Sequence, residues 1–238
     1  MNSALRTIAS VLGAMVCGVA APAQAPQTVS ASYNVYMNGA HVAVMNETFE
    51  ARDKGYRIVS ESVPLGVLAL FQKPATVVSN GNVTTEGLRP ERFEGRRVGS
   101  GQVKAEFDWQ NARLTFSHDG KAETVALPAG TQDRLSIMYQ FMFYAYDKLD
   151  RLDFAMTDGR RFTQHQYLVT PGVEIETPLG RMATLHLVKQ TDSDGGGTEI
   201  WLTRQQHYYL PVKMVIRESN GTRYEQVATR IEIKSAPQ

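Results

Sequence analysis

Apolar and polar residues alternate with a period of two along most of this chain, and this pattern restricts the fold more than any other feature. The clearest example is 102–109, whose apolar members are Val103, Ala105, Phe107 and Trp109. Similar alternation occurs in 56–61, 113–116, 210–216 and 227–233. Because successive side chains of a strand point to opposite faces, the pattern predicts strands with one buried face and one solvated face.

Short turn sequences separate the alternating segments. They include Asn38-Gly39, Asp53-Lys54-Gly55, Asn80-Gly81, Asp119-Gly120, Asp158-Gly159 and Ser219-Asn220-Gly221. Turns this tight join antiparallel strands, since parallel strands need a long crossover. We therefore expect an antiparallel meander, with further strands at 29–36, 40–51, 76–86, 90–98, 122–127, 152–156, 161–169, 172–177, 180–190 and 198–203.

Two segments interrupt the alternation. Residues 64–72 form a dense apolar stretch that predicts a short helix or a lid. Residues 131–146 predict the main helix, with Thr131 as its N-cap and Asp133 in its first turn. This helix would be apolar on nearly all sides, so it must be buried on several of them. The predicted fold is therefore mainly β: a curved antiparallel sheet, as a half-barrel or open barrel, with one main α-helix packed on its concave side.

The N-terminus has the layout of a secretory signal. Arg6 is the only charged residue before Pro26, and an apolar run at 8–21 follows it. Two Ala-x-Ala exits close the run, at Ala21-Pro22-Ala23 and Ala23-Gln24-Ala25. A positive start, a short apolar middle and such an exit are typical of signal peptides. We predict a signal peptide at 1–25, with cleavage after Ala23 or Ala25.

Removal of this signal defines the expected mature chain. It is a single all-β envelope domain at 26–238, located in the periplasm and without a transmembrane span. The only cysteine, Cys17, lies in the signal, so no disulfide stabilises the mature chain. Val16 precedes that cysteine and disfavours lipid attachment there. Acidic and basic residues balance in the mature part, which argues against a nucleic-acid partner.

Arginines at two places in the sequence each allow two interpretations. Arg89, Arg92, Arg96 and Arg97 are interleaved with glutamates, which favours a solvated strand face over a phosphate site. Asp133 and Arg134 stand at the start of the expected main helix. There they are expected to cap the helix and tie it to a strand end; the alternative is that Arg134 clamps a ligand carboxylate.

The sequence carries none of the common catalytic signatures. The five histidines lack the spacing of metal ligands, and the sequence has no nucleophile elbow, P-loop or dinucleotide fingerprint. Ser136 lacks a neighbouring histidine, and Glu47, Glu50 and Glu61 would make an acid pair only if the fold brought them together. We therefore expect a protein that is not an enzyme, with no catalytic residue, cofactor or metal.

Several motifs carry a likeness to a known family. They are Gly87-Leu88-Arg89-Pro90, Phe107-Asp108-Trp109, Gln132-Asp133-Arg134-Leu135-Ser136, Thr177-Pro178-Leu179-Gly180, and Ile200-Trp201-Leu202 leading to Tyr209-Leu210-Pro211-Val212. With them the chain resembles DUF3108, a bacterial envelope family of unknown function, which implies no activity or catalytic residue. The hairpin containing Trp201 and Pro211 is also similar to the last hairpin of the periplasmic lipoprotein carriers. That likeness implies an incompletely closed sheet with helices over a hydrophobic concave face, and Trp201 and Pro211 as structural residues.

These observations predict non-enzymatic binding or carriage of a hydrophobic, lipid-like envelope ligand. The candidate ligand-binding residues are Leu68, Phe71, Met138, Phe141, Met142 and Tyr144. The alternative is an envelope assembly factor that binds another protein through an exposed strand edge or patch. A continuous apolar cavity would favour the first function, and a filled core with an exposed apolar patch would favour the second. A hydrolase is the third option, and it requires a polar cleft with two carboxylates.

Overall fold

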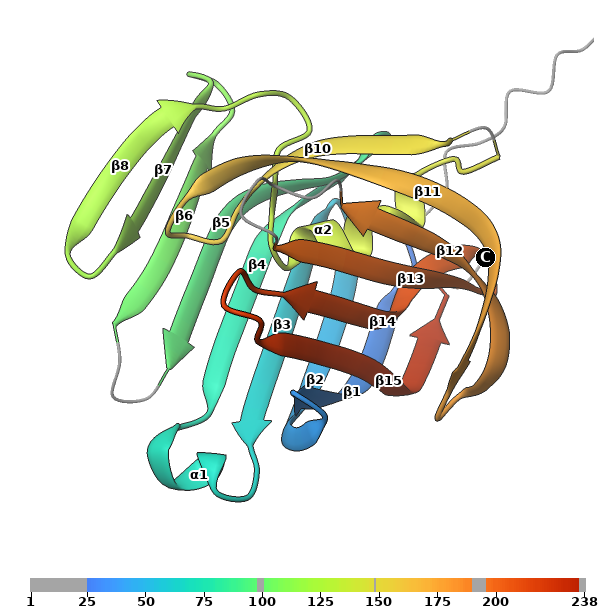
Figure 1. Ribbon diagram of the computed structural model, residues 1–238. Coiled ribbons are helices and arrows are strands. Elements are labelled where there is room, and N and C mark those ends of the chain that lie inside the picture. Colours follow the sequence, from blue (N-terminus) through green and yellow to red (C-terminus); the bar gives the residue numbers. More distant parts are fainter. Residues whose placement is uncertain (1–24, 98–100, 148, 190–195, 236–238) are drawn as a thin grey trace, which may run out of the picture.

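The computed structural model describes residues 25–97, 101–147, 149–189 and 196–235, so the predicted signal peptide lies almost wholly outside the described part. Within these residues the chain is mainly β (Figure 1). The strands are β1 (Thr28–Met37), β2 (Ala40–Arg52), β3 (Gly55–Pro64), β4 (Ala75–Thr84), β5 (Gly87–Arg97), β6 (Gln102–Asp108), β7 (Arg113–His118), β8 (Lys121–Ala126), β9 (Gln132–Asp133), β10 (Arg151–Thr157), β11 (Phe162–Thr177), β12 (Gly180–Lys189), β13 (Gly197–Gln205), β14 (Tyr208–Arg217) and β15 (Arg223–Lys234).

All these strands belong to one sheet, in the order β8-β7-β6-β5-β4-β3-β2-β1-β15-β14-β13-β12-β11-β10-β9. Every neighbouring pair is antiparallel except β9 and β10. One antiparallel meander runs from β1 to β8 and a second runs from β10 to β15. They join where β1 pairs with β15, with Thr28 opposite Lys234. Since β8 and β9 are the two edges and do not pair, the sheet stays open. The expected curved, antiparallel and open sheet is therefore confirmed.

The expected main helix is wrong. Only α2 (Ser136–Gln140) and the adjoining 3₁₀ turn η1 (Phe141–Phe143) are helical in 131–146. Gln132 and Asp133 instead form β9, parallel to Met156 and Thr157 of β10. The Thr131 hydroxyl donates to the carbonyl of Pro128, 2.7 Å away, and does not cap a helix. Nearly every position of this segment is apolar, and such a segment can be buried in many conformations. The spacing of its residues therefore did not specify a long helix.

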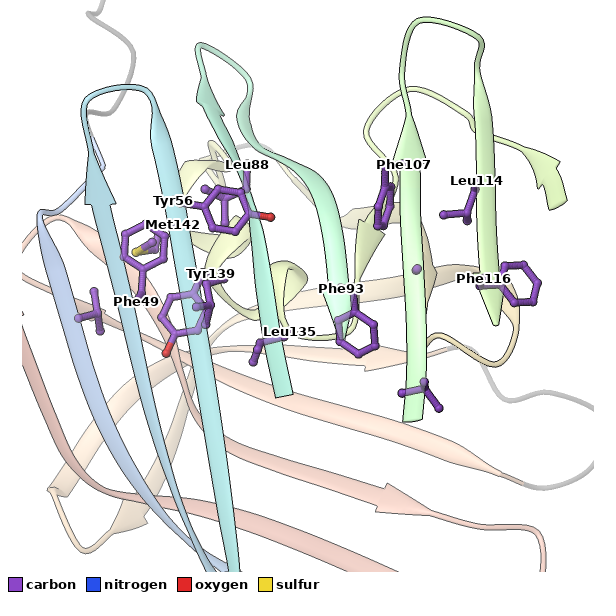
Figure 2. Close-up of a cluster of buried hydrophobic side chains, with 14 of the residues drawn as sticks. Phe49, Tyr56, Leu88, Phe93, Phe107, Leu114, Phe116, Leu135, Tyr139 and Met142 are labelled. Carbon is purple, nitrogen blue, oxygen red and sulfur yellow. The ribbon is translucent and has the colours of Figure 1, made fainter. Parts of the chain in front are cut away.

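The core lies on both sides of this short helix. Leu135, Tyr139 and Met142 join the cluster formed by β1 to β7, in which the rings of Tyr139 and Phe49 stack 5.3 Å apart (Figure 2). Ile137 and Phe141 join a second cluster, formed with β10 to β13. The α2–η1 segment thus fills the space between the two halves of the curled sheet, in contact with β5 and β14.

Two glycines shape the second half of the sheet. The expected strands at 161–169 and 172–177 are one strand, β11, with a bulge where Gly172 adopts a φ of +75°. Gly159, in the turn between β10 and β11, packs onto β5 and β6, where a Cβ atom would lie 3.1 Å from Cβ of Val103. This contact brings the β10–β11 turn over the inner face of β5 and β6.

The apolar segment 64–72 contains α1 (Leu68–Phe71), a single turn of helix between β3 and β4. Figure 1 shows α1 projecting beyond the sheet at the end of this hairpin.

Candidate functional site

The six candidate ligand-binding residues divide between two parts of the fold. Phe141 and Met142 are buried, while Met138 and Tyr144 are half-buried against the same core clusters. Leu68 and Phe71 lie on α1, and 80% of the surface of Phe71 is exposed. The fold therefore brings together the group Met138, Phe141, Met142 and Tyr144 and leaves Leu68 and Phe71 outside it.

Side chains occupy the space beside α2. A pocket between Met138, Tyr139, Glu47 and Pro211 has about 0 Å³ of room for a water-sized sphere. The side chains around Met138 and Tyr139 are therefore closely packed.

Asp133 is buried and satisfied within the chain. Its Oδ1 accepts the backbone N–H groups of Leu135 and Ser136, at 2.9 and 2.8 Å, and its own N–H donates to Oγ of Ser136. Oγ of Ser79 donates to Oδ2 at 2.6 Å, and the hydroxyl of Tyr56 lies 3.1 Å from that Oγ. Asp133 thus caps the turn into α2 and ties it to β4. Burial raises the pKa of this carboxyl, although the hydrogen bonds oppose the shift.

Glu47 is the second buried carboxyl. It lies on the inner face of β2, and the hydroxyl of Tyr139 donates to its Oε2 at 3.2 Å. Burial raises the pKa of Glu47, although hydrogen bonds from Ser60 and Tyr139 and the charge of Arg134 oppose the shift. Glu50 and Glu61 do not accompany it, because Glu61 is exposed and Glu50 is only half-buried on the strand. The acid pair that the sequence allowed is therefore not formed by these three residues.

A pH dependence of stability follows from Glu47. A carboxyl whose pKa is raised by folding binds more protons in the folded state than in the unfolded state, so the free energy of unfolding falls as the pH rises. The fall begins near the ordinary value, 4.5, and ends above the raised pKa. We expect Glu47→Gln to reduce this fall without abolishing it, because the pKa of Asp133 is raised as well; urea unfolding at a series of pH values measures the slope. Glu61→Gln, at an exposed position of β3, is the matched control, and a wild-type slope in Glu47→Gln would contradict the assignment.

Trp201 and Pro211 lie in the paired strands β13 and β14. The Trp201 ring stacks on His186 at 4.4 Å, with the ammonium group of Lys213 5.4 Å from its centroid. The carbonyl of Pro211 accepts a hydrogen bond from the hydroxyl of Tyr33 at 3.3 Å. Trp201 thus links the neighbouring strands β12, β13 and β14, and Pro211 links β14 to β1 across the intervening β15.

The arginines of β5 have different surroundings. Arg89 lies over the ring of Trp109, and Arg92 forms an ion pair with Glu94 at 2.5 Å. Arg96 lines a pocket, and the side chain of Arg97 lies outside the described part.

This pocket has a volume of about 390 Å³. Strands β4, β5 and β6 supply one side of it through Ala75, Val77, Gly95 and Val103. The segment after β9 and the β10–β11 turn supply the other side, through Arg134, Asp158 and Arg160. Sequence reasoning had not selected Arg160, because no periodicity relates it to Arg134; the parallel pairing of β9 with β10 brings them to one place.

Three large apolar side chains are exposed together at one place on the surface. Val67, Leu70 and Phe71, at the end of the β3–β4 hairpin, are 73%, 75% and 80% exposed. We call these three residues the apolar tip. Sequence reasoning had selected the segment but not Val67 or Leu70, and only the projection of the hairpin exposes them together.

Two further properties apply to the described residues alone. They contain no group of three or more His, Cys, Asp or Glu side chains arranged to hold a metal ion. None of their helices has the length and apolar character required to cross a membrane.

Comparison with known proteins gives a family and a similar solved structure. Comparison with the curated proteins gives no match. Among solved structures, the fold is similar to that of a protein from Bacteroides fragilis NCTC 9343, described as a candidate exported protein with a YmcC-like fold. The two are 10% identical with a TM-score of 0.34, over 89% of this chain and 97% of that chain. The model of the family described as "Protein of unknown function (DUF3108)" matches residues 32–228, so the chain belongs to the DUF3108 family.

Proposed function

We propose that this protein is a non-enzymatic binding protein of the periplasm, and that it holds to a lipid surface through the apolar tip. The observation that carries the proposal is the exposure of Val67, Leu70 and Phe71, each above 70%, at the end of a projecting hairpin. Exposed apolar groups gathered at one place mark an interaction surface. The lack of room in the pocket beside Met138 and Tyr139 favours a lipid contact on the outside of the molecule.

The charge around the tip favours a phospholipid surface as the partner. No acidic residue occurs between Glu61 and Glu86, while Lys73 stands two residues after Phe71. Lysine beside inserted apolar side chains suits an anionic headgroup layer. A protein interface normally buries about 800 Å² on each partner, which a single helical turn does not provide.

The sheet edges offer less to a partner protein. The edge strand β8 presents exposed Lys121 and Glu123, and charged residues discourage pairing with a foreign strand. The opposite edge, β9, has two residues only, and both are buried. Docking by strand addition, the route expected for an assembly factor, is therefore the weaker alternative.

The test is cosedimentation of the mature protein with vesicles of phosphatidylethanolamine and phosphatidylglycerol. Burying one Leu or Phe side chain contributes about 1.5–3 kcal/mol, so Leu70→Ser combined with Phe71→Ser should weaken vesicle binding by about 100-fold. Because both side chains are exposed, thermal stability should not change.

Leu168→Ser is the matched control, since Leu168 is 46% exposed on β11, away from the tip. It should leave vesicle binding unchanged. Equal binding of the double variant and the wild type would refute the proposal. Absence of vesicle binding, together with crosslinking from position 71 to one envelope protein, would establish the assembly factor instead.

A further inference from the structure

We propose that the pocket between β4–β6 and the β10–β11 turn binds a small anion carried on a short apolar group, with Arg134 and Arg160 as its anion ligands. Nothing in the lipid-surface proposal requires this site. The proposed site corresponds to the alternative interpretation of the sequence, in which Arg134 binds the anionic group of a ligand.

The pocket combines an apolar side with a cationic side. Ala75, Val77 and Val103 are its apolar members, and the inward-facing Gly95 lies among them. Arg96, Arg134 and Arg160 oppose a single carboxylate, that of Asp158. A surface of this composition is complementary to an anionic group attached to an alkyl body.

The guanidinium of Arg134 reaches across toward Phe93 and Gly95 on the opposite side of the pocket. Its Cζ lies 5.7 Å from the ring centroid of Phe93, within range of a cation–π contact. Its Nη2 lies 3.9 Å from the position that a Cβ atom of Gly95 would take. The backbone N–H of Arg134 donates to the carbonyl of Thr157 at 2.9 Å, which fixes the start of this side chain beside β10. The charge is therefore oriented before any ligand arrives.

Two acidic groups beside the pocket have partners within the chain. Oδ1 of Asp158 accepts the backbone N–H groups of Arg160 and Arg161, at 2.9 and 3.0 Å, so this carboxylate stabilises its own turn. Nη1 of Arg160 donates to Oδ2 of Asp119 at 3.2 Å, which holds Arg160 at the pocket and leaves its other N–H groups for a second acceptor. Among the residues that line it, the pocket thus has three arginines and one carboxylate, while Glu47 also feels the charge of Arg134.

Guanidinium groups select the chemistry of the ligand. They bind phosphate and carboxylate through two parallel N–H donors. Lysine cannot form this paired contact, so arginine binds these anions with more defined geometry. The volume of about 390 Å³ lies within the range of small-molecule sites and exceeds what one phosphate group needs. The remaining room adjoins Ala75, Val77 and Val103, which suits a short alkyl chain.

This ligand chemistry has two sources, a free amphiphilic anion and the headgroup of an anionic lipid. Ala75 lines the pocket and opens β4, the strand that directly follows α1. The pocket and the apolar tip consequently belong to the same end of the β3–β4 hairpin, which is the reason for testing a lipid headgroup as one of the two sources.

Calorimetric titration of the purified mature protein with hexyl phosphate tests the proposal. Hexyl phosphate should bind, inorganic phosphate should bind more weakly, and the neutral hexyl glucoside should not bind. Arg134→Gln and Arg160→Gln should each weaken binding of hexyl phosphate by about 10-fold or more, since each removes a charged hydrogen-bond donor. Arg204→Gln removes one exposed charge from β13 and should leave binding unchanged.

A second variant keeps the test independent of folding defects in the arginine variants. Ala75→Leu fills the pocket and retains every arginine, so it should abolish binding while the melting temperature stays near that of the wild type. Equal affinity for hexyl phosphate and hexyl glucoside, or wild-type affinity in both arginine variants or in Ala75→Leu, would overturn the proposal.

The source is decided by competition with phosphatidylglycerol vesicles. Displacement of hexyl phosphate by these vesicles assigns the site to a lipid headgroup, and its retention assigns the site to a free anion. The Leu70→Ser, Phe71→Ser variant should still bind soluble hexyl phosphate with wild-type affinity. Failure of the apolar tip and failure of the pocket are therefore distinguishable.

Discussion

Asp133→Ala is expected to lower the free energy of unfolding by about 3 kcal/mol or more. The substitution removes the acceptor of two backbone N–H groups, at Leu135 and Ser136, and of the Ser79 hydroxyl. Each buried donor left without an acceptor costs about 1–3 kcal/mol. Release of the buried charge offsets part of this loss, because burial already opposes ionisation and raises the pKa of Asp133. Urea unfolding followed by circular dichroism provides the measurement.

Asp133→Asn is the matched control. Its amide oxygen can still accept the N–H groups of Leu135 and Ser136, so the loss should be less than half of that in Asp133→Ala. A similar loss in the two variants would show that the negative charge, and not the cap, stabilises this turn. Unchanged stability in Asp133→Ala would refute the structural role assigned here.

Gly81→Ala is expected to lower the free energy of unfolding by about 1–3 kcal/mol or more. A Cβ atom at this position would lie 2.2 Å from the carbonyl oxygen of Arg89 and 2.8 Å from Cα of Pro90. Both are backbone atoms of β5, opposite the bulge that shifts the register between Asn80 and Gly81. Relief requires the two strands to separate at the point where Leu88 and Phe93 begin to fill the core.

Gly197→Ala is the control for this substitution. No atom would lie within 4 Å of its Cβ, so stability should change little. Thermal unfolding of the two variants side by side gives the comparison. A melting temperature of Gly81→Ala equal to that of Gly197→Ala would contradict the close approach of β4 and β5.

The strands were predictable because their information is local. The alternation in 102–109 places Val103, Ala105 and Phe107 on the buried face of β6, as expected. The α2 segment was not predictable in the same way, since Ile137, Tyr139 and Phe141 are buried by two different clusters. Residues surrounded by core on several sides leave no periodic pattern from which a helix length can be deduced.

The two proposed sites depended on the tertiary structure to different degrees. Phe71 was a candidate from the sequence because its segment is densely apolar, but its exposure follows only from the projection of the hairpin. Arg160 gave no signal at all. It reaches the pocket because Gly159 lets the β10–β11 turn pack against Phe93 and Val103, which are distant along the chain.

The sequence by itself determined the strand content and the antiparallel connections of this protein, and it predicts an export signal. These properties depend on the order of residues within short stretches: an apolar run before Ala-x-Ala, a period of two, and glycine-containing turns. Only the tertiary structure decided that β1 pairs with β15, that α2 fills the space between the two halves, and that Arg134 and Arg160 share a pocket. Those outcomes depend on how a large sheet curls and on which side chains then pack in its interior. Both are determined by residues far apart in the sequence, so no local pattern predicts them.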